Sequence, residues 1–172
     1  ACPTETQVGL LAAALDPAAV SRVLDLKGRT EAATVAVIVP DAEAVTSVAT
    51  VLPDGARLLA ARYWPGPMTL ILPAKEGIPA ALVRDGKVGV RVPGASPALT
   101  LARHFGGPLT ATSANRTGSP PCLSDDDVRR AFPTGIDLVV PGVAPGGPPS
   151  TMVDATVDPI LVLRQGAIRI DD

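Results

Sequence analysis

Two cations flank a glycine at Lys27-Gly28-Arg29, where a helical pattern ends. Phosphate oxygens bind best to fixed, charge-assisted donors, and arginine offers a planar fork while lysine offers a point charge. These two residues therefore predict a clamp for a phosphate-bearing small molecule. The alternative is that both cations are solvated and complement the dipole at the helix C-terminus.

Small polar residues follow an apolar run at positions 110–115. Such residues let a ligand approach the backbone closely, and Ser113 and Asn115 can both donate hydrogen bonds to phosphate oxygens. The alternative is a polar turn closed by bonds between side chains and backbone. Ser150 leaves a loop rich in Gly and Pro, and Arg164 ends the last long apolar run. A cation at a strand end can face the cleft of an α/β sheet.

Polar groups near the N-terminus and within one apolar run could bind a small polar ligand. The PTET run at positions 3–6 offers two hydroxyls and a carboxylate before a turn that contains Gly9, although an ordinary polar strand end has the same composition. Arg91 lies within the otherwise apolar run 88–92. A buried arginine needs an anionic partner or access to solvent, so a structural ion pair and a ligand contact are both open.

Caps and prolines mark the helices that must position these groups. Asp16-Pro17 and Ser96-Pro97 have the pattern of an N-cap followed by proline, and a glycine suits the end of the first helix. The WPGP run at 64–67 predicts a rigid corner with the tryptophan packed beneath it. The expected helices run from Asp16 to Gly28, from Asp41 through Val51, through Leu58 to Trp64-Pro65, from Ser96 through Phe105, and from Ser124 onward.

Apolar runs between these helices predict strands. Several are continuously apolar, as in strands covered on both faces, and their alternation with helices indicates an α/β domain around a central sheet. The last runs have no helices between them, so we expect antiparallel pairing there and a mixed sheet overall. The expected strands are 35–39, 68–72, 88–92, 109–112, 136–140, 151–155 and 160–163.

The composition narrows the class of protein. Hydrophobic residues make up 47% of the 172 residues and aromatic residues only 2%, so the core must consist of Val, Leu, Ile and Ala. The net charge of −2 argues against broad, non-specific binding of nucleic acid. Cys2 and Cys122 stand in no metal-ligand spacing and predict two reduced thiols in a cytoplasmic protein, with a disulfide left open. No apolar run reaches the ~20 residues of a membrane span.

The motifs, taken in order, resemble those of the threonylcarbamoyl-adenylate synthase family, the YrdC-like domain. They are PTET, KGR, WPGPMTL, VGVRVP, TSANRTG, STMVD and LRQGAI, and they extend from Pro3 to about Ile168. There is no Walker P-loop, GxGxxG or zinc-type cluster, so a nucleotide site has to be assembled from distant segments. The resemblance implies a single YrdC-like domain over 1–172, without the family's usual first strand. Its fold would be a twisted, open, mixed parallel and antiparallel sheet flanked by helices, with a large concave cleft.

The resemblance also implies a reaction and roles for individual residues. The family joins L-threonine, bicarbonate and ATP, with Mg²⁺ on the phosphates, into threonylcarbamoyl-adenylate and pyrophosphate for tRNA modification. By this resemblance Lys27 and Arg29 are catalytic and no residue is a metal ligand. The implied partners are tRNA-modification proteins, and tRNA or double-stranded RNA is a further implied partner. The implied ATP contacts are Lys27, Arg29, Ser113, Asn115 and Arg164, and the implied threonine contacts are Thr4, Arg91, Ala111 and Ser150.

Three positions depart from the family pattern. The family commonly has a tyrosine where this chain has Val8, a histidine where it has Ile38, and a glutamate where it has Pro149. Two of these belong to the threonine side of the site. The alternative functions are therefore an altered module that binds a nucleotide or double-stranded RNA, and a carbamate-adenylating domain excised from a longer protein.

Overall fold

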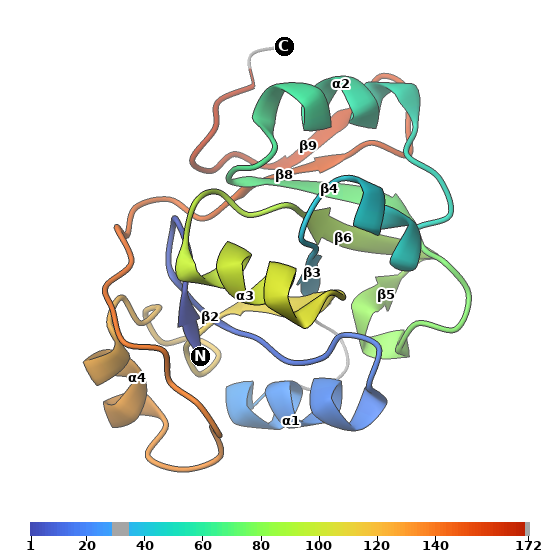
Figure 1. Ribbon diagram of the computed structural model, residues 1–172. Coiled ribbons are helices and arrows are strands. Elements are labelled where there is room, and N and C mark those ends of the chain that lie inside the picture. The colour runs from blue at the N-terminus through green and yellow to red at the C-terminus, as the bar shows by residue number, and fades with distance from the viewer. Residues whose placement is uncertain (29–34, 171–172) are drawn as a thin grey trace.

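Nine strands form one mixed sheet in the computed structural model, which describes residues 1–28 and 35–170 (Figure 1). The order is β1-β2-β7-β3-β6-β4-β8-β9, and β5 pairs with β6. The pairs β3·β6 and β4·β8 are parallel and the others are antiparallel. The strands are β1 (Cys2–Pro3), β2 (Val8–Leu10), β3 (Ala36–Ile38), β4 (Met68–Pro73), β5 (Val83–Arg84), β6 (Lys87–Arg91), β7 (Leu109–Ser113), β8 (Thr151–Asp154) and β9 (Leu161–Arg164).

Local capping chemistry sets the helix starts. Asp16 accepts a hydrogen bond from the Ala18 amide at 2.9 Å, and Ser124 forms a capping box with Asp127. Gly28 ends the first helix with φ +62°, in the left-handed region that favours glycine. The helices are α1 (Pro17–Lys27), α2 (Asp54–Tyr63), α3 (Pro97–Phe105) and α4 (Asp125–Ala131), with the 3-10 helices η1 (Glu43–Ser47) and η2 (Ala80–Leu82).

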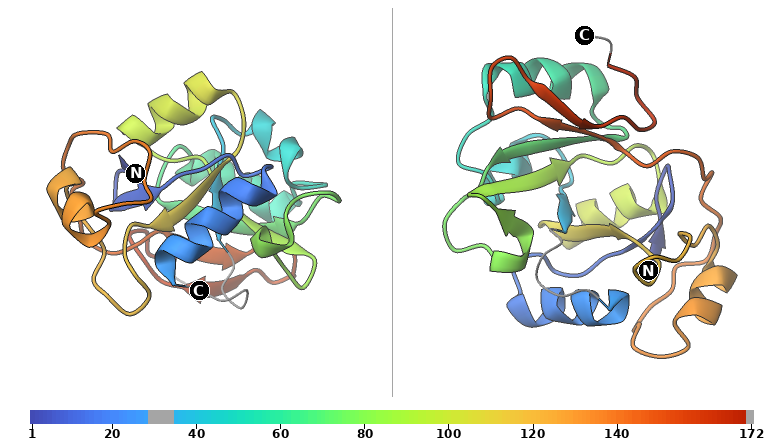
Figure 2. Two further views of the ribbon diagram at one scale, coloured as in Figure 1. Left: turned by 90° about the horizontal axis from the view of Figure 1, so that it is seen from below. Right: turned by 180° about the vertical axis from the view of Figure 1, so that it is seen from behind.

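Helices flank the sheet, and two of them lie at its opposite ends. α2 lies at the β4–β8–β9 end and α1 lies at the opposite end (Figure 1). Seen from behind, β6, β8 and β9 lie nearest the viewer while α2 and α3 lie beyond them (Figure 2). This is the mixed sheet flanked by helices that the sequence predicts, and the antiparallel β8·β9 pair confirms the expected pairing near the C-terminus.

The core consists of aliphatic side chains, as the composition requires. Its largest cluster includes the fully buried Val37, Leu70 and Val90 on the central strands β3, β4 and β6. The Trp64 indole donates to the Met68 carbonyl at 2.7 Å, which confirms the predicted corner. Cys2 and Cys122 are buried free thiols. No helix in the described ranges is long and apolar enough to cross a membrane.

Two sequence predictions of secondary structure are wrong. The segment 136–140 forms no strand: the Ala1 ammonium donates to the Leu138 carbonyl at 2.7 Å and the Val140 amide donates to the Ala1 carbonyl at 2.9 Å, without a regular ladder. The helix expected from Asp41 through Val51 is a short 3-10 helix that ends at Ser47. Asp41 accepts a hydrogen bond from the Ala44 amide at 2.9 Å, but the cap position of this 3-10 helix is Ala42, which makes no side-chain cap bond.

Candidate anion-binding cavity

A cavity of about 410 Å³ lies against the central strands and brings together polar residues that are distant in sequence. Six of the residues implied as ligand contacts line it, and they come from the turn after β1, from β6 and β7, and from the loop and strands at the C-terminal end. These six are Thr4, Arg91, Ala111, Ser113, Ser150 and Arg164. Lys27 and Asn115 do not line it, and Arg29 lies outside the described residues.

The Thr4 hydroxyl organises the turn that forms one wall. It donates to the Gln7 carbonyl at 2.7 Å and accepts from the Thr6 and Gln7 amides at 3.1 and 3.2 Å. Side-chain bonds of this kind close a turn without help from secondary structure. The turn therefore presents the side chains of Thr4, Thr6 and Gln7 to the cavity in fixed positions.

Arg91 ends β6 and supplies a buried guanidinium to the cavity wall. Its side chain is 10% exposed, and its Nε donates to the Gly66 carbonyl at 3.2 Å. Its Nη2 forms an ion pair with Glu5, whose Oε1 accepts from the Gly94 amide at 2.7 Å. Arg91 Nη2 and Glu5 Oε2 are both buried, so this ion pair is shielded from solvent. Arg91 thus has both the ion pair and the cavity position that the sequence left open.

A second guanidinium reaches the same cavity from the end of β9. Arg164 donates to the Ser150 carbonyl through Nε at 3.2 Å and through Nη2 at 2.8 Å, and the Ser150 hydroxyl lies 2.8 Å from the Thr69 hydroxyl. Burial and the nearby charge of Arg91 lower the pKa of Arg164. Two cations that repel each other across a cavity favour an anionic ligand, which would neutralise both.

Lys27 is buried and is not among the residues that line the cavity. It is 1% exposed, and its Nζ donates to the Ser113 carbonyl, to the Asn115 carbonyl at 3.1 Å and to Asn115 Oδ1 at 2.8 Å. In return the Thr117 amide donates to the Lys27 carbonyl at 2.9 Å. The C-terminus of α1 is therefore tied to the turn after β7. The Asn115 side chain also donates to the Ser119 carbonyl at 2.6 Å, so this turn is closed by side-chain bonds.

Sequence reasoning missed Arg84, which also lines the cavity. It ends β5, in a hairpin whose Asp85 and Gly86 have φ +51° and +72°. Asp-Gly is the typical sequence of a two-residue hairpin turn, so this dipeptide was the available signal for both the strand and the residue. In the part of the chain that the structure describes, no group of three or more His, Cys, Asp or Glu side chains could hold a metal ion.

The three departures from the family pattern all border the cavity. Val8 on β2, Ile38 on β3 and Pro149 before β8 are among the residues that line it. Val8 and Ile38 are each 1% exposed, so the wall that they form is apolar. The cavity therefore combines an apolar wall with the guanidinium groups of Arg91 and Arg164.

The open mixed sheet, with a cationic cavity against it, places this chain among the YrdC-like α/β proteins, and solved structures share the fold. Pyrococcus abyssi Sua5 complexed with L-threonine superposes with a TM-score of 0.90 at 37% identity, over 95% of this chain and 49% of that chain. Escherichia coli YciO shares the fold, with a TM-score of 0.83 at 24% identity over 96% of this chain and 82% of that chain.

Sequence comparisons identify the family to which the chain belongs. The model of the Sua5/YciO/YrdC family, described as telomere recombination, matches residues 1–166, and the chain belongs to this family. The Pyrococcus abyssi threonylcarbamoyl-AMP synthase is 36% identical over 100% of this chain and 51% of its own length. The Chromobacterium violaceum threonylcarbamoyl-AMP synthase is 38% identical over 88% of this chain and 79% of its own length. The chain thus spans about half the length of the first of these relatives.

Proposed function

We propose that this chain is a threonylcarbamoyl-AMP synthase, which forms threonylcarbamoyl-adenylate and pyrophosphate from L-threonine, bicarbonate and ATP. The relatives with that name match it at 36% and 38% identity, and the P. abyssi relative has been solved with L-threonine. The observation that carries the proposal is the cavity in which Arg91 and Arg164 meet the hydroxyl-bearing residues Thr4 and Ser150. The same comparisons favour a synthase over a module that only binds a nucleotide or double-stranded RNA.

Arg91 is the residue best suited to the carboxylate of threonine or to the carbamate made from it. Its guanidinium lies at the cavity wall, where Nη2 pairs with Glu5 and Nε donates to the Gly66 carbonyl. The remaining N–H groups of this guanidinium could form a charge-assisted bond with a carboxylate, and such a bond is stronger than one between neutral groups. In this proposal Thr4 and Ser150 contribute hydroxyl groups to the amino acid, and Ala111 lies against it through its backbone.

The chemistry requires the neutralisation and alignment of anions. A carbamate oxygen forms a bond to the α-phosphorus of ATP while the bond from that phosphorus to the pyrophosphate oxygen breaks, so pyrophosphate leaves with the electron pair. Cations at the site offset the charges that must approach one another, and a fixed geometry aligns the reacting groups. We assign Arg164, Ser113 and Asn115 to the nucleotide, with Lys27 and Arg29 from the KGR motif.

Lys27 contributes to this site through the turn that it supports. Its ammonium donates to the Ser113 and Asn115 carbonyls and to Asn115 Oδ1, which holds the TSANRTG turn in place. Magnesium would enter with ATP, because phosphate oxygens and waters supply most of its ligands in such sites. We place the reaction in the cytoplasm, and we propose that its product passes to tRNA-modification proteins.

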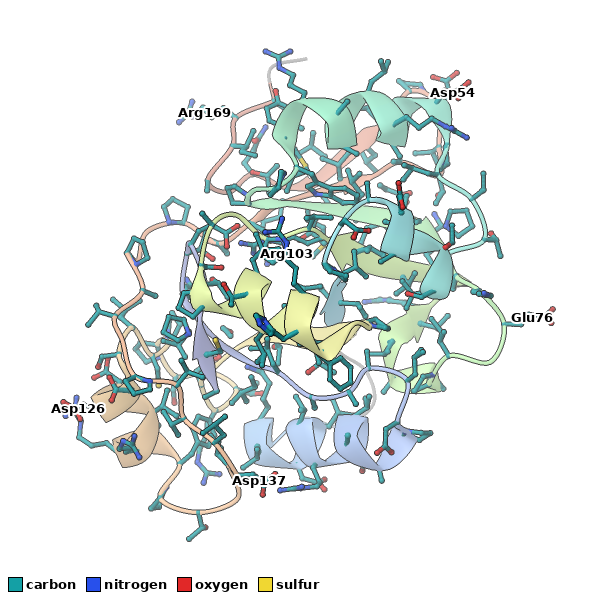
Figure 3. All side chains as sticks on the ribbon, viewed as in Figure 1. Asp54, Glu76, Arg103, Asp126, Asp137 and Arg169 are labelled. Carbon is teal, nitrogen blue, oxygen red and sulfur yellow. The ribbon has the colours of Figure 1, made fainter. Side chains whose placement is uncertain are left out.

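The test is release of pyrophosphate by purified protein with ATP, Mg²⁺ and bicarbonate, with and without L-threonine. We expect threonine-dependent release that falls about 10- to 100-fold in kcat/KM for threonine in Arg91→Ala, from the loss of a charge-assisted bond. Arg169→Ala is the matched control, because Arg169 is exposed and projects outward in Figure 3. Absence of threonine-dependent release from the wild type would refute the synthase. An RNA affinity that falls with salt, without affinity for ATP, would favour the RNA-binding alternative.

A further inference from the structure

Glu5 is the carboxylate that accompanies the buried arginine of the cavity, yet it does not line the cavity itself. Its side chain is 16% exposed and forms the ion pair with Arg91. Arg91 Nε is the one guanidinium N–H that donates a hydrogen bond within the described residues, to the Gly66 carbonyl at 3.2 Å. Glu5 therefore contacts the guanidinium and leaves N–H groups of the same side chain for a ligand.

The Glu5 carboxylate joins three separate segments. It extends from the turn closed by Thr4, contacts the last residue of β6, and accepts the Gly94 amide at 2.7 Å. The Gly94 carbonyl in turn accepts the Ser96 hydroxyl at 2.9 Å, next to the start of α3. A Cβ on Gly94 would lie 3.0 to 3.3 Å from Glu5 side-chain atoms, so a glycine is what lets the carboxylate approach this backbone so closely.

We propose that Glu5 is a positioning residue, which holds the Arg91 guanidinium in the orientation that binds the anionic group of the amino-acid substrate. A buried guanidinium needs an anionic partner, and Glu5 supplies it while its other contacts fix the carboxylate in place. Glu5 also offsets one of the two positive charges that Arg91 and Arg164 place at the cavity. The identity of the substrate rests on the proposed function, whereas the positioning of Arg91 does not.

Steady-state kinetics of pyrophosphate release can separate positioning from a general effect on folding. We expect Glu5→Ala to raise the KM for threonine about tenfold or more, while the KM for ATP changes less than about twofold. Glu5→Gln keeps an oxygen that can accept the Gly94 amide, so it should restore most of the affinity for threonine. Glu76→Gln is the matched control, because Glu76 projects into solvent from the loop after β4 (Figure 3).

A double-mutant cycle tests whether Glu5 acts through Arg91. In an Arg91→Ala background, Glu5→Ala should change the KM for threonine by less than about twofold, because the group that it positions is already absent. An independent tenfold effect in that background would overturn the proposal. Equal increases in both KM values for Glu5→Ala would also overturn it, since they indicate a general loss of structure.

The side-chain Nε–H of Arg91 provides a readout that needs no enzyme activity. In ¹⁵N-correlated NMR spectra we expect a slowly exchanging Arg91 Nε–H in the wild type and in Glu5→Gln, and a rapidly exchanging or broadened one in Glu5→Ala. If Glu5→Ala does not fold, the comparison of wild type with Glu5→Gln and Glu5→Asp provides the test, with the shorter Asp side chain expected to lose the signal. If the wild type releases no pyrophosphate, the proposed function is refuted. If the Arg91 Nε–H signals are unchanged in the Glu5 variants, the proposal that Glu5 positions Arg91 is refuted.

Discussion

Replacement of Lys27 by methionine tests whether this lysine stabilises the turn after β7 or acts directly on substrate. Lys27 is fully buried and donates to the Ser113 carbonyl, the Asn115 carbonyl and Asn115 Oδ1. Methionine has a similar length and an apolar side chain, so Lys27→Met retains most of the packing while it removes the ammonium group. The substitution removes one donor from each of three oxygens, although the Ser113 carbonyl keeps the Asn115 amide at 3.0 Å and Asn115 Oδ1 keeps the Ser113 hydroxyl at 2.7 Å.

The magnitude follows from the loss of three charge-assisted hydrogen bonds. Each contributes about 1.5–3 kcal/mol, and the partners that two of the oxygens keep, together with the gain from no longer burying an ammonium, offset part of the sum. We therefore expect a net loss of about 3 kcal/mol in the free energy of unfolding. For a domain of this size each kcal/mol lowers the melting temperature by about 2–4 °C, so the melting temperature should fall by roughly 6–12 °C.

The assay is thermal and urea unfolding followed by circular dichroism, with pyrophosphate release measured on the same samples. Lys75→Met is the matched control, because Lys75 is exposed and donates to the Thr46 carbonyl at 3.1 Å. Its loss should change the free energy of unfolding by less than about 0.5 kcal/mol. A Lys27→Met protein that loses activity but remains within about 1 kcal/mol of the wild type would refute this reasoning. Lys27 would then have to act on the substrate itself.

Two further predictions concern the titratable groups. Burial raises the pKa of Asp154, but hydrogen bonds from Lys87 and Thr156 outweigh this effect and lower the pKa below its usual range. The ionised carboxyl therefore stabilises the fold at pH values above its unfolded-state pKa of about 3.9. This stabilisation is lost as the pH falls through the folded-state pKa. Asp154→Asn should therefore melt below the wild type at pH 7, and the difference should shrink below about pH 4; a constant difference would contradict this. Burial raises the pKa of Cys2 to about 11 and also raises the pKa of Cys122. A disulfide reagent at pH 8 should therefore react slowly with both thiols in the folded protein and rapidly with both after unfolding. Rapid labelling of both thiols in the folded protein would contradict the buried positions.

The parts of the fold that local chemistry decides could be predicted from the sequence. Asp16, Ser96 and Ser124 each cap a helix where the sequence places the cap, because an N-cap needs only a side chain and the next few amides. The run 136–140 is as apolar as the true strands, but a strand also needs a partner, and its backbone is bonded to the chain start without a ladder. Apolar composition alone does not specify such a partner.

Only some of the residues that line the cavity could be predicted from the sequence. The motifs identified Arg91 and Arg164, but no local sequence pattern shows that Arg91 forms an ion pair with Glu5 or that Arg164 donates to the Ser150 carbonyl. Both contacts depend on the order of the strands in the sheet. The sequence predicts that Lys27 and Arg29 of the KGR motif contact phosphate, but it does not show that Lys27 is buried with its ammonium among acceptors of the turn after β7.

The register of two central strands explains why the cavity suits a ligand with both an anionic and an apolar part. β3 and β6 are parallel, and Ile38 is paired with Arg91 across them. Paired residues on neighbouring strands point to the same face of a sheet, and both of these residues line the cavity. The guanidinium therefore stands beside an aliphatic side chain, and Val8 on β2 extends the apolar wall. Threonine, with a carboxylate and a methyl group, has both parts. Valine and isoleucine also have a carboxylate and an apolar side chain. Measuring pyrophosphate release with threonine, valine and isoleucine in competition would show how far the apolar wall formed by Ile38 and Val8 determines the choice of substrate.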